Sequence, residues 1–237
     1  MYPTVSIIIP FYNDPYIEQA IYSALSQTYP CTEIVVVDDG STMYQDRIMP
    51  YMKHINYLGK ANGGTASALN HGIRCCSGQY IAWLSSDDMF YPDKVERQLK
   101  FMLERHAAAS YTAFDDINGY NEILRRSVSA RFASQAALVR AFASSDPING
   151  CTIMLNKELF THLGYFNEGL RYTQDYEMWI RVLLGRVPIH FLDESLTMYR
   201  WHEQMGTRRH SEAVMQEVGW LQAQYAQRLL DYAAELG

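Results

Sequence analysis

The sequence predicts an α/β fold in which a mostly parallel central sheet is flanked by helices. Residues 5–10 and 34–37 are rich in β-branched side chains on both faces, as in strands buried between two layers of helices. Between them, apolar residues recur at helical spacing over residues 16–27, and Asp14-Pro15 supplies a helix start. Strand, helix and strand in this order form a right-handed crossover unit of a parallel sheet.

The same alternation continues to residue 105. The elements expected there are a short helix at 44–52, a strand at 55–58, a helix at 66–76, a strand at 80–84 and a helix at 92–105. Asp38 and Asp39 follow the second strand of the chain, and Asp87 and Asp88 follow the strand at 80–84. Because ligands in open α/β sheets bind at the carboxyl ends of the strands, we expect these acids to share one site.

The second half of the chain is predicted to elaborate the same domain. Asn118-Gly119 is a turn signal that indicates a hairpin between strands at 109–114 and 122–128. The other elements expected there are a helix at 134–142, a strand at 152–155, helices at 157–163 and 176–184, and short strands at 189–192 and 196–199. We therefore expect one domain over residues 1–205.

A C-terminal helical extension is expected over residues 206–237. One of its faces carries an apolar stripe formed by Val214, Val218, Leu221, Tyr225, Leu229 and Tyr232. This stripe is predicted to pack on the body of the protein or on a second copy, which would give a homodimer. The opposite face is not notably basic, which disfavours a helix lying on a membrane surface.

Composition excludes several classes of protein. A net charge of −6 argues against broad binding to nucleic acid or to anionic lipid. The four cysteines have neither zinc-site nor Cys-x-x-Cys spacing, which indicates reduced thiols in a cytoplasmic protein. No apolar run of about 18 residues occurs and the N-terminus lacks the pattern of a signal peptide, so we expect no transmembrane segment.

The acidic pair Asp87-Asp88 allows two interpretations on its own. Two hard oxygen ligands at the end of a strand suit a divalent cation that itself holds phosphates. The alternative is a strand-to-helix loop in which one acid caps the helix and the other faces water. The rest of the chain favours the cation site, because further polar segments are expected at the same edge of the sheet.

Six segments in order resemble family 2 glycosyltransferases. They are residues 5–13, 34–42, 62–72, 80–98, 164–181 and 199–202. The resemblance implies a single Rossmann-like, nucleotide-sugar-binding domain of the glycosyltransferase A type. It also implies a nucleotide-binding half at residues 1–105 and an acceptor-binding half at residues 106–205.

By this resemblance the donor is a nucleoside-diphosphate sugar, with UDP as the expected nucleotide. The implied donor-binding residues are Pro10, Phe11, Tyr12, Asp38, Asp39, Lys60, Asn62, Gly63, Asp87 and Arg200. The first three would form a flat wall for the base, and an acid of the second strand end would accept a hydrogen bond from it or from ribose. Backbone amides at residues 62–65 would lie near phosphate at a helix N-terminus. The alternative for residues 39–42 is a turn that caps the next helix.

The resemblance also implies Mn²⁺ or Mg²⁺ bound by Asp88, Asp87 and His202. Asp88 is expected to be the main ligand and Asp87 to contact ribose, while His202 closes over the metal or the diphosphate. A solvated or capping histidine is the alternative for His202. Ser85 stands where the family frequently has an additional Asp, which leaves two carboxylates instead of three.

The general base implied by the resemblance is Asp175. Gln174-Asp175 occupies the place of the family's Glu-Asp pair, at the start of a predicted helix, and the reaction would invert the sugar. The alternative is an acid placed there by the helix dipole alone. Arg200-Trp201 lacks the upstream Gln of processive synthases, so we expect one sugar per transfer.

The expected enzyme adds this sugar to a glycan or glycolipid in cell-surface polysaccharide biosynthesis, in the cytoplasm at the inner face of the membrane. Two alternatives from other classes remain: a non-catalytic nucleotide-sugar-binding module and a sugar nucleotidyltransferase.

Overall fold

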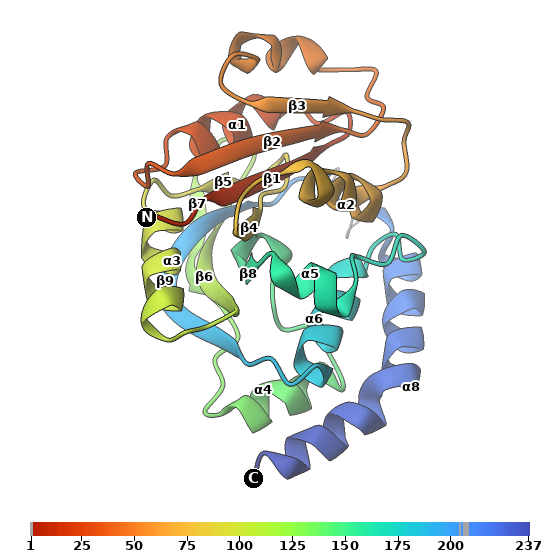
Figure 1. Ribbon diagram of the computed structural model, residues 1–237. Coiled ribbons are helices and arrows are strands. Elements are labelled where there is room, and N and C mark those ends of the chain that lie inside the picture. Colours follow the sequence, from red (N-terminus) through yellow and green to blue (C-terminus); the bar gives the residue numbers. More distant parts are fainter. Residues whose placement is uncertain (1, 204, 206–208) are drawn as a thin grey trace.

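The computed structural model describes residues 2–203, 205 and 209–237 (Figure 1). Within these residues, nine strands form one sheet in the order β3-β2-β1-β4-β8-β6-β9-β5, and β7 pairs with β6. Helices lie on both faces of this sheet, and a long C-terminal helix runs along one side of the molecule (Figure 1). The predicted α/β fold is therefore confirmed.

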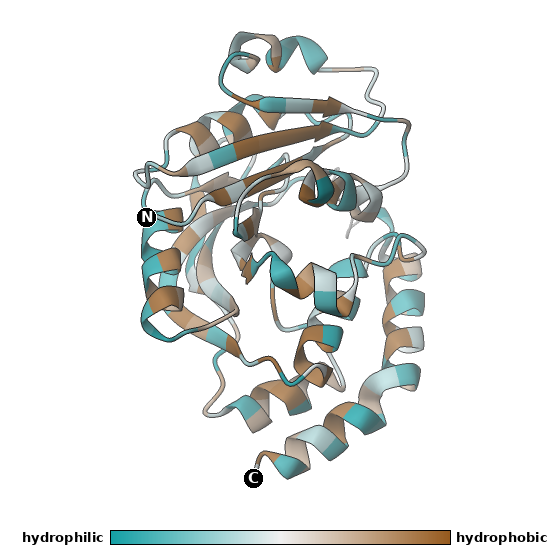
Figure 2. Cartoon of the chain, in the orientation of Figure 1, coloured by the Kyte–Doolittle hydropathy of each residue, from teal (hydrophilic) through white to brown (hydrophobic). Residues whose placement is uncertain are grey.

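The first half of the sheet is parallel, as predicted. Its strands are β1 (Val5–Phe11), β2 (Thr32–Asp38), β3 (Asn56–Gly59) and β4 (Tyr80–Trp83), and its helices are α1 (Ile17–Leu25), α2 (Thr65–Cys75) and α3 (Lys94–Glu104). Ile7 and Ile9 of β1 pack with α1, whereas Ile8 packs with α2 on the other face. The short helix expected at 44–52 is instead two 3₁₀ turns, Gln45–Arg47 and Met49–Tyr51. Figure 2 shows the apolar residues of the strands lying between the helices.

The second half makes the sheet mixed. It contains β5 (Met89–Phe90), β6 (Ala109–Ile117), β7 (Ile123–Val128), β8 (Met154–Asn156), β9 (Ile189–Arg200), α4 (Gln135–Phe142), a 3₁₀ turn (Gly150–Thr152), α5 (Glu158–Leu163) and α6 (Gln174–Leu184). β6 runs parallel to β9, but β4–β8, β6–β8, β6–β7 and β5–β9 are antiparallel pairs. The predicted hairpin is confirmed as β6–β7.

Two short strands were expected where the structure has the single strand β9. The register against β6 shifts between Thr112 and Phe114, so an irregularity joins the two apolar runs without ending the strand. This continuous strand carries the chain from the far end of the sheet to Arg200, next to the candidate site.

The C-terminal helix α8 (Ser211–Glu235) packs on the body of the protein. It contacts α4 and α6, and Leu221, Leu229 and Tyr232 are buried. The apolar stripe therefore packs within the chain. The homodimer was predicted from this stripe, which is no longer available for a second copy. In the described part of the chain, no helix combines the length and apolar character needed to cross a bilayer.

Candidate functional site

The parallel strands bring their carboxyl ends to one edge of the sheet. Phe11 at the end of β1 is in register with Asp38 at the end of β2, and Asp38 is in register with Gly59 of β3. The loops after β1, β2, β3 and β4 therefore meet, as the sequence predicts.

Asp38 is buried, and the loop that follows β2 occupies its carboxylate. Oδ1 accepts a hydrogen bond from the amide of Ser41 at 2.7 Å, and Oδ2 accepts from Gln45 Nε2 at 2.8 Å and from the Tyr57 hydroxyl. Burial alone would raise the pKa of Asp38, but these hydrogen bonds outweigh it and hold the pKa below its ordinary value. Asp38 is therefore stabilised as a carboxylate that fixes the loop.

Asp39 binds the N-terminus of α2. Its carboxylate lies 2.6 Å from Lys60 Nζ and accepts from the amides of Gly63 at 3.0 Å and Gly64 at 2.7 Å. Asn62 Nδ2 donates to the Asp39 carbonyl at 2.9 Å. The lysine and the amides that the sequence places beside a phosphate are thus bound, in this structure, to a carboxylate of the same chain.

The wall expected from Pro10, Phe11 and Tyr12 is only partly available. The Phe11 ring is fully buried in the core beside α1, so the prediction that it faces a base is wrong. The alternation of β1 explains this, because Phe11 points to the same face as Ile7 and Ile9. Tyr12 is 55% exposed and Pro10 is partly exposed, and both remain accessible.

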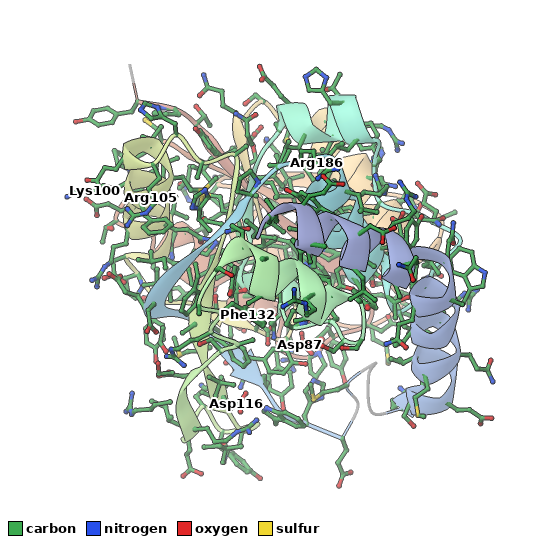
Figure 3. The ribbon with its side chains drawn as sticks, turned by 90° about the horizontal axis from the view of Figure 1, so that it is seen from below. Asp87, Lys100, Arg105, Asp116, Phe132 and Arg186 are labelled. Carbon is green, nitrogen blue, oxygen red and sulfur yellow. The ribbon has the colours of Figure 1, made fainter. Side chains whose placement is uncertain are left out.

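Asp87 and His202 meet beyond the end of β4. His202 Nε2 lies 3.0 Å from Asp87 Oδ2, and the two side chains keep exposed fractions of 13% and 22%, respectively. The ring of Tyr16 packs edge-on against His202, with centroids 5.4 Å apart. The structure therefore joins two segments that the sequence singled out separately (Asp87 is labelled in Figure 3).

Asp88 lies behind Asp87, away from solvent. Its Oδ1 accepts from the Arg200 amide at 2.8 Å, and its Oδ2 is buried beside the Cys151 thiol without a hydrogen bond of ordinary geometry. Burial raises the pKa of Asp88 well above its ordinary value, and the charge of Asp87 raises it further. The sequence ranked Asp88 first as metal ligand, but the structure makes Asp87 the accessible acid.

Ser85 has a partner of its own. Its Oγ lies 2.9 Å from Cys151 Sγ, and its amide donates to the same sulfur at 3.3 Å. The thiol in turn contacts Asp88. An additional Asp at position 85 would bring a third carboxylate close to this buried acid, so serine fits the space better.

The Arg200 side chain links the turn after β4 to the β6–β7 hairpin and to α1. Its Nε donates to the Asp87 carbonyl at 2.6 Å, its Nη1 to Asn118 O and Asn121 Oδ1, and its Nη2 to Gln19 Oε1 at 2.9 Å. The side chain is fully buried. The predicted contact of Arg200 with donor phosphate does not fit this geometry, because all three nitrogens bind the protein. Arg200 instead fixes the β4 turn against the β6–β7 hairpin.

Asp14 belongs to the site, although the sequence identifies it only as a helix start. Its Oδ1 accepts from the Tyr16 amide at 2.7 Å, and its carboxyl also hydrogen-bonds with Ser86. Burial raises the pKa of Asp14 to about 6, and the charge of Asp87 adds to the shift, while His202 opposes it. No local pattern signals this contact, because it joins the β1–α1 loop to the turn after β4.

Asp87, His202 and Asp88 are the residues of this site that could hold a divalent cation. No three His, Cys, Asp or Glu side chains form a ready-made metal cluster within residues 2–203, 205 and 209–237. Asp87 and His202 nevertheless offer an oxygen and a nitrogen at one point, and behind them Asp88 Oδ2 has no partner among the described residues apart from the Cys151 thiol. This donor set fits a cation that takes its remaining ligands from a phosphate-bearing substrate and water.

Asp175 stands in the first turn of α6 and is half-buried. Its Oδ1 accepts from the Tyr176 amide at 3.0 Å. Burial raises the pKa of Asp175 to about 6, and the charge of Glu217 adds to the shift, while backbone amides oppose it. A carboxyl group with such a pKa is well suited to accept a proton near neutral pH.

Sequence comparison decides the family. The family model described as "Glycosyl transferase family 2" matches residues 6–164, more than half of the chain. The chain belongs to glycosyl transferase family 2. The matched range includes Asp39, Asp87 and Asp88 and ends before Asp175 and His202.

Individual relatives agree with this family. A glycosyltransferase of Rickettsia felis is 38% identical over 221 residues, which is 87% of this chain and 36% of that protein. TuaG of Bacillus subtilis, a candidate teichuronic acid biosynthesis glycosyltransferase, is 34% identical over 206 residues, or 84% of this chain and 79% of TuaG. The chondroitin synthase of Escherichia coli is 32% identical over 76% of this chain and 26% of its own length. The chain thus spans about a third of the length of the Rickettsia relative.

Solved structures share the fold. TarS of S. aureus superposes with a TM-score of 0.74 at 22% identity, over 98% of this chain and 42% of TarS. Further TarS structures contain UDP, with a TM-score of 0.74, or UDP-GlcNAc, with a TM-score of 0.71. At this identity the likeness establishes the fold.

Proposed function

We propose that this glycosyltransferase moves a single sugar, with inversion, from a UDP-linked donor to a glycan or glycolipid of the cell surface. The observation that carries the proposal is that two candidate acids, Asp87 and Asp175, lie on different elements of the fold. Asp87 lies with His202 at the strand edge, whereas Asp175 stands apart on α6 with a pKa raised to about 6. Leaving-group stabilisation and acceptor activation need two such separate groups.

Residues 1–105 are proposed to hold the nucleotide. Tyr12 and Pro10 remain accessible beside the loop that Asp38 and Asp39 organise. The complexes of TarS with UDP and UDP-GlcNAc support a UDP-sugar donor for this fold. In this proposal, Asp39 and Lys60 both bind the nucleotide. Hydrogen bonds to the nucleotide then replace part of the ion pair that the two side chains form with each other.

A divalent cation, Mn²⁺ or Mg²⁺, is proposed at Asp87 and His202, with Asp88 behind them. When bound, it neutralises the charge of the departing diphosphate. Arg200 keeps Asp87 and Asp88 in place, since it donates to the carbonyl of the first and, through its amide, to the carboxylate of the second. His202 is held against Asp87 by Tyr16.

Asp175 is proposed as the general base. It takes the proton of the acceptor hydroxyl as that oxygen attacks the anomeric carbon from the side opposite the diphosphate, which inverts the configuration. Residues 106–205 would then hold the acceptor. The relationship to TuaG and to a chondroitin synthase supports an acceptor in cell-surface polysaccharide biosynthesis. We place this activity in the cytoplasm, at the inner face of the membrane.

A binding and turnover experiment tests the proposal. Melting temperature is measured with UDP, GDP, dTDP and CMP, each with Mn²⁺ and with chelator, and UDP with Mn²⁺ is expected to give the largest increase because a ligand stabilises the folded state by mass action. Turnover is then followed with UDP-sugars, and the anomeric configuration of the product is read by NMR. The proposal fails if no nucleotide stabilises the protein in the presence of metal, or if the product retains its configuration. Donor binding without turnover would indicate a binding module.

A further inference from the structure

The C-terminal helix α8 contributes one carboxylate to the start of α6. Glu217 Oε1 accepts a hydrogen bond from the amide of Arg171 at 3.0 Å. Glu217 Oε2 accepts from the amides of Tyr172 and Thr173 at 3.1 and 3.0 Å, and from the Thr173 hydroxyl at 2.8 Å. All of these donors lie in the three residues that precede α6.

This arrangement anchors the segment that leads into α6 to a distant element. The amides at a helix start lack partners within the helix, and a negative charge there is favoured by the helix dipole. Thr173 is the N-cap residue of α6, but its side chain makes no capping bond and donates to Glu217 instead. One carboxylate of α8 therefore holds the N-cap residue of α6 and the two residues before it.

We propose that Glu217 is a positioning residue for Asp175: it holds residues 171–173 and thereby fixes the first turn of α6, on which the base stands. This inference rests on the proposed role of Asp175. It makes α8, which lies outside the matched family range of residues 6–164, a working part of the site.

The other end of the same connection has its own anchor. Arg181 of α6 donates to the carbonyls of Leu163 at 2.6 Å and Tyr165 at 2.7 Å. Arg181 is in turn paired with Glu177 at 2.7 Å. The connection between α5 and α6 is thus held at both ends, and Glu217 is the anchor adjacent to the base.

The charge of Glu217 also acts on the base directly. In the described chain, the charge of Glu217 from α8 raises the pKa of Asp175. The Asp146 carboxyl from the loop after α4 also interacts with Asp175, and burial together with the charge of Asp175 raises the pKa of Asp146 well above its ordinary value. Glu217 is an acid, so its negative charge disfavours the ionised form of Asp175. Removing the Glu217 charge is therefore expected to lower the pKa of Asp175 from about 6.

The test uses the whole chain and needs no substrate. The carboxyl carbons of ¹³C-labelled aspartate are titrated by NMR in the wild type and in Glu217→Gln, and Asp175→Asn identifies the resonance of Asp175. We expect Asp175 to titrate near pH 6 in the wild type and at lower pH in Glu217→Gln. Hydrogen exchange of the amides of residues 171–176 is expected to be about tenfold faster in Glu217→Gln.

The matched control is Glu235→Gln at the opposite end of α8. Glu235 forms an exposed ion pair with Arg186, which Figure 3 labels beside this end of the helix. The control should leave both the Asp175 titration and the exchange of residues 171–176 unchanged. If Glu217→Gln also leaves both unchanged, the inference is overturned.

A second variant covers a loss of stability. If the melting temperature of Glu217→Gln is too low for a titration, Glu217→Asp is used instead, because it keeps the charge on a shorter side chain. In this variant the amides of residues 171–176 must exchange faster, while Asp175 still titrates near its wild-type value. Wild-type exchange in Glu217→Asp overturns the inference. In turnover, Glu217→Gln should lower kcat about tenfold with little change in donor KM. Full turnover by Asp175→Asn would instead refute the proposed role of Asp175 as base, whereas the exchange data would still report on the contact of Glu217 with residues 171–173.

Discussion

Two pairs of adjacent acids lie at or after the carboxyl ends of β2 and β4, at the same edge of the sheet, and the fold uses them in different ways. The carboxylates of Asp38 and Asp39 are saturated by amides, side chains and a lysine, and the pKa of Asp38 lies below its ordinary value. Among the described residues, the Asp88 Oδ2 atom has only the Cys151 thiol beside it, and burial raises the pKa of Asp88. The first pair organises a loop through bonds to the protein, and the second retains an accessible carboxylate for a cation.

The backbone that follows each pair explains the difference. After Asp39, Gly40 has a φ of +78°, and a Cβ there would approach the Asn62 amide nitrogen to 2.9 Å, so the two loops pack closely and their amides reach the acid. After Asp88, the chain enters β5, which pairs with β9 and directs Arg200 and His202 to the acids. Identical residue pairs thus acquire different chemistry from their neighbours.

The largest effect is expected on kcat when Asp175, a third acid that belongs to neither pair, is replaced. Asp175→Asn keeps the size of the side chain but removes the proton acceptor, so kcat should fall by about 10²–10⁴-fold. Because burial disfavours the charged form of Asp175, the melting temperature should not decrease. Initial rates and thermal melting check this. Wild-type turnover by the variant would remove Asp175 from the reaction.

The pH profile of kcat should show the same group. A base works when it is deprotonated, and the pKa of Asp175 is raised to about 6. Below pH 6, kcat should therefore fall about tenfold per pH unit, and above it kcat should level off. An acidic limb near pH 4, the ordinary value for aspartate at about 3.9, would contradict the assignment.

A smaller effect, on stability, is expected at the saturated pair. Asp38→Asn removes a charged acceptor from the bonds with Ser41, Gln45 and Tyr57, and should lower the free energy of unfolding by about 1.5–3 kcal/mol at pH 7. The folded pKa of Asp38 is depressed, so this contribution is present above the unfolded pKa and is lost as pH falls through the folded value. Urea unfolding from pH 3 to 7 measures it, and a deficit that is the same at every pH would break the contrast.

The smallest effect is expected at the unsaturated pair. The pKa of Asp88 is raised, so its contribution to stability is present below the unfolded pKa and is lost as pH rises through the folded value. Asp88→Asn stays neutral throughout. In acid, its free energy of unfolding should be within about 1 kcal/mol of the wild-type value. As pH rises, the variant should become more stable relative to the wild type. A loss that grows with pH, as predicted for Asp38→Asn, would show that the two pairs are alike.

The sequence predicted the sheet edge and most of the residues that meet there. β-Branched runs and helical periodicity are local signals, so β1, β2, β4 and the loops after them could be placed. The mixed parallel and antiparallel pairing of the strands from β5 through β9 could not be predicted, because it depends on contacts between distant segments. For the same reason the burial of Arg200, the position of Asp14 beside Asp87 and the contact of Glu217 with α6 leave no local pattern in the sequence.

Binding of UDP tests the central claim that Asp87, and not the saturated pair, carries the diphosphate and its cation. Isothermal titration of UDP with and without Mn²⁺ is compared between wild type and Asp87→Asn. We predict that Mn²⁺ increases the affinity of the wild type for UDP, that Asp87→Asn loses at least about tenfold of this metal-dependent affinity, and that both bind UDP equally in chelator. Equal metal-dependent affinity in the two proteins would contradict the account.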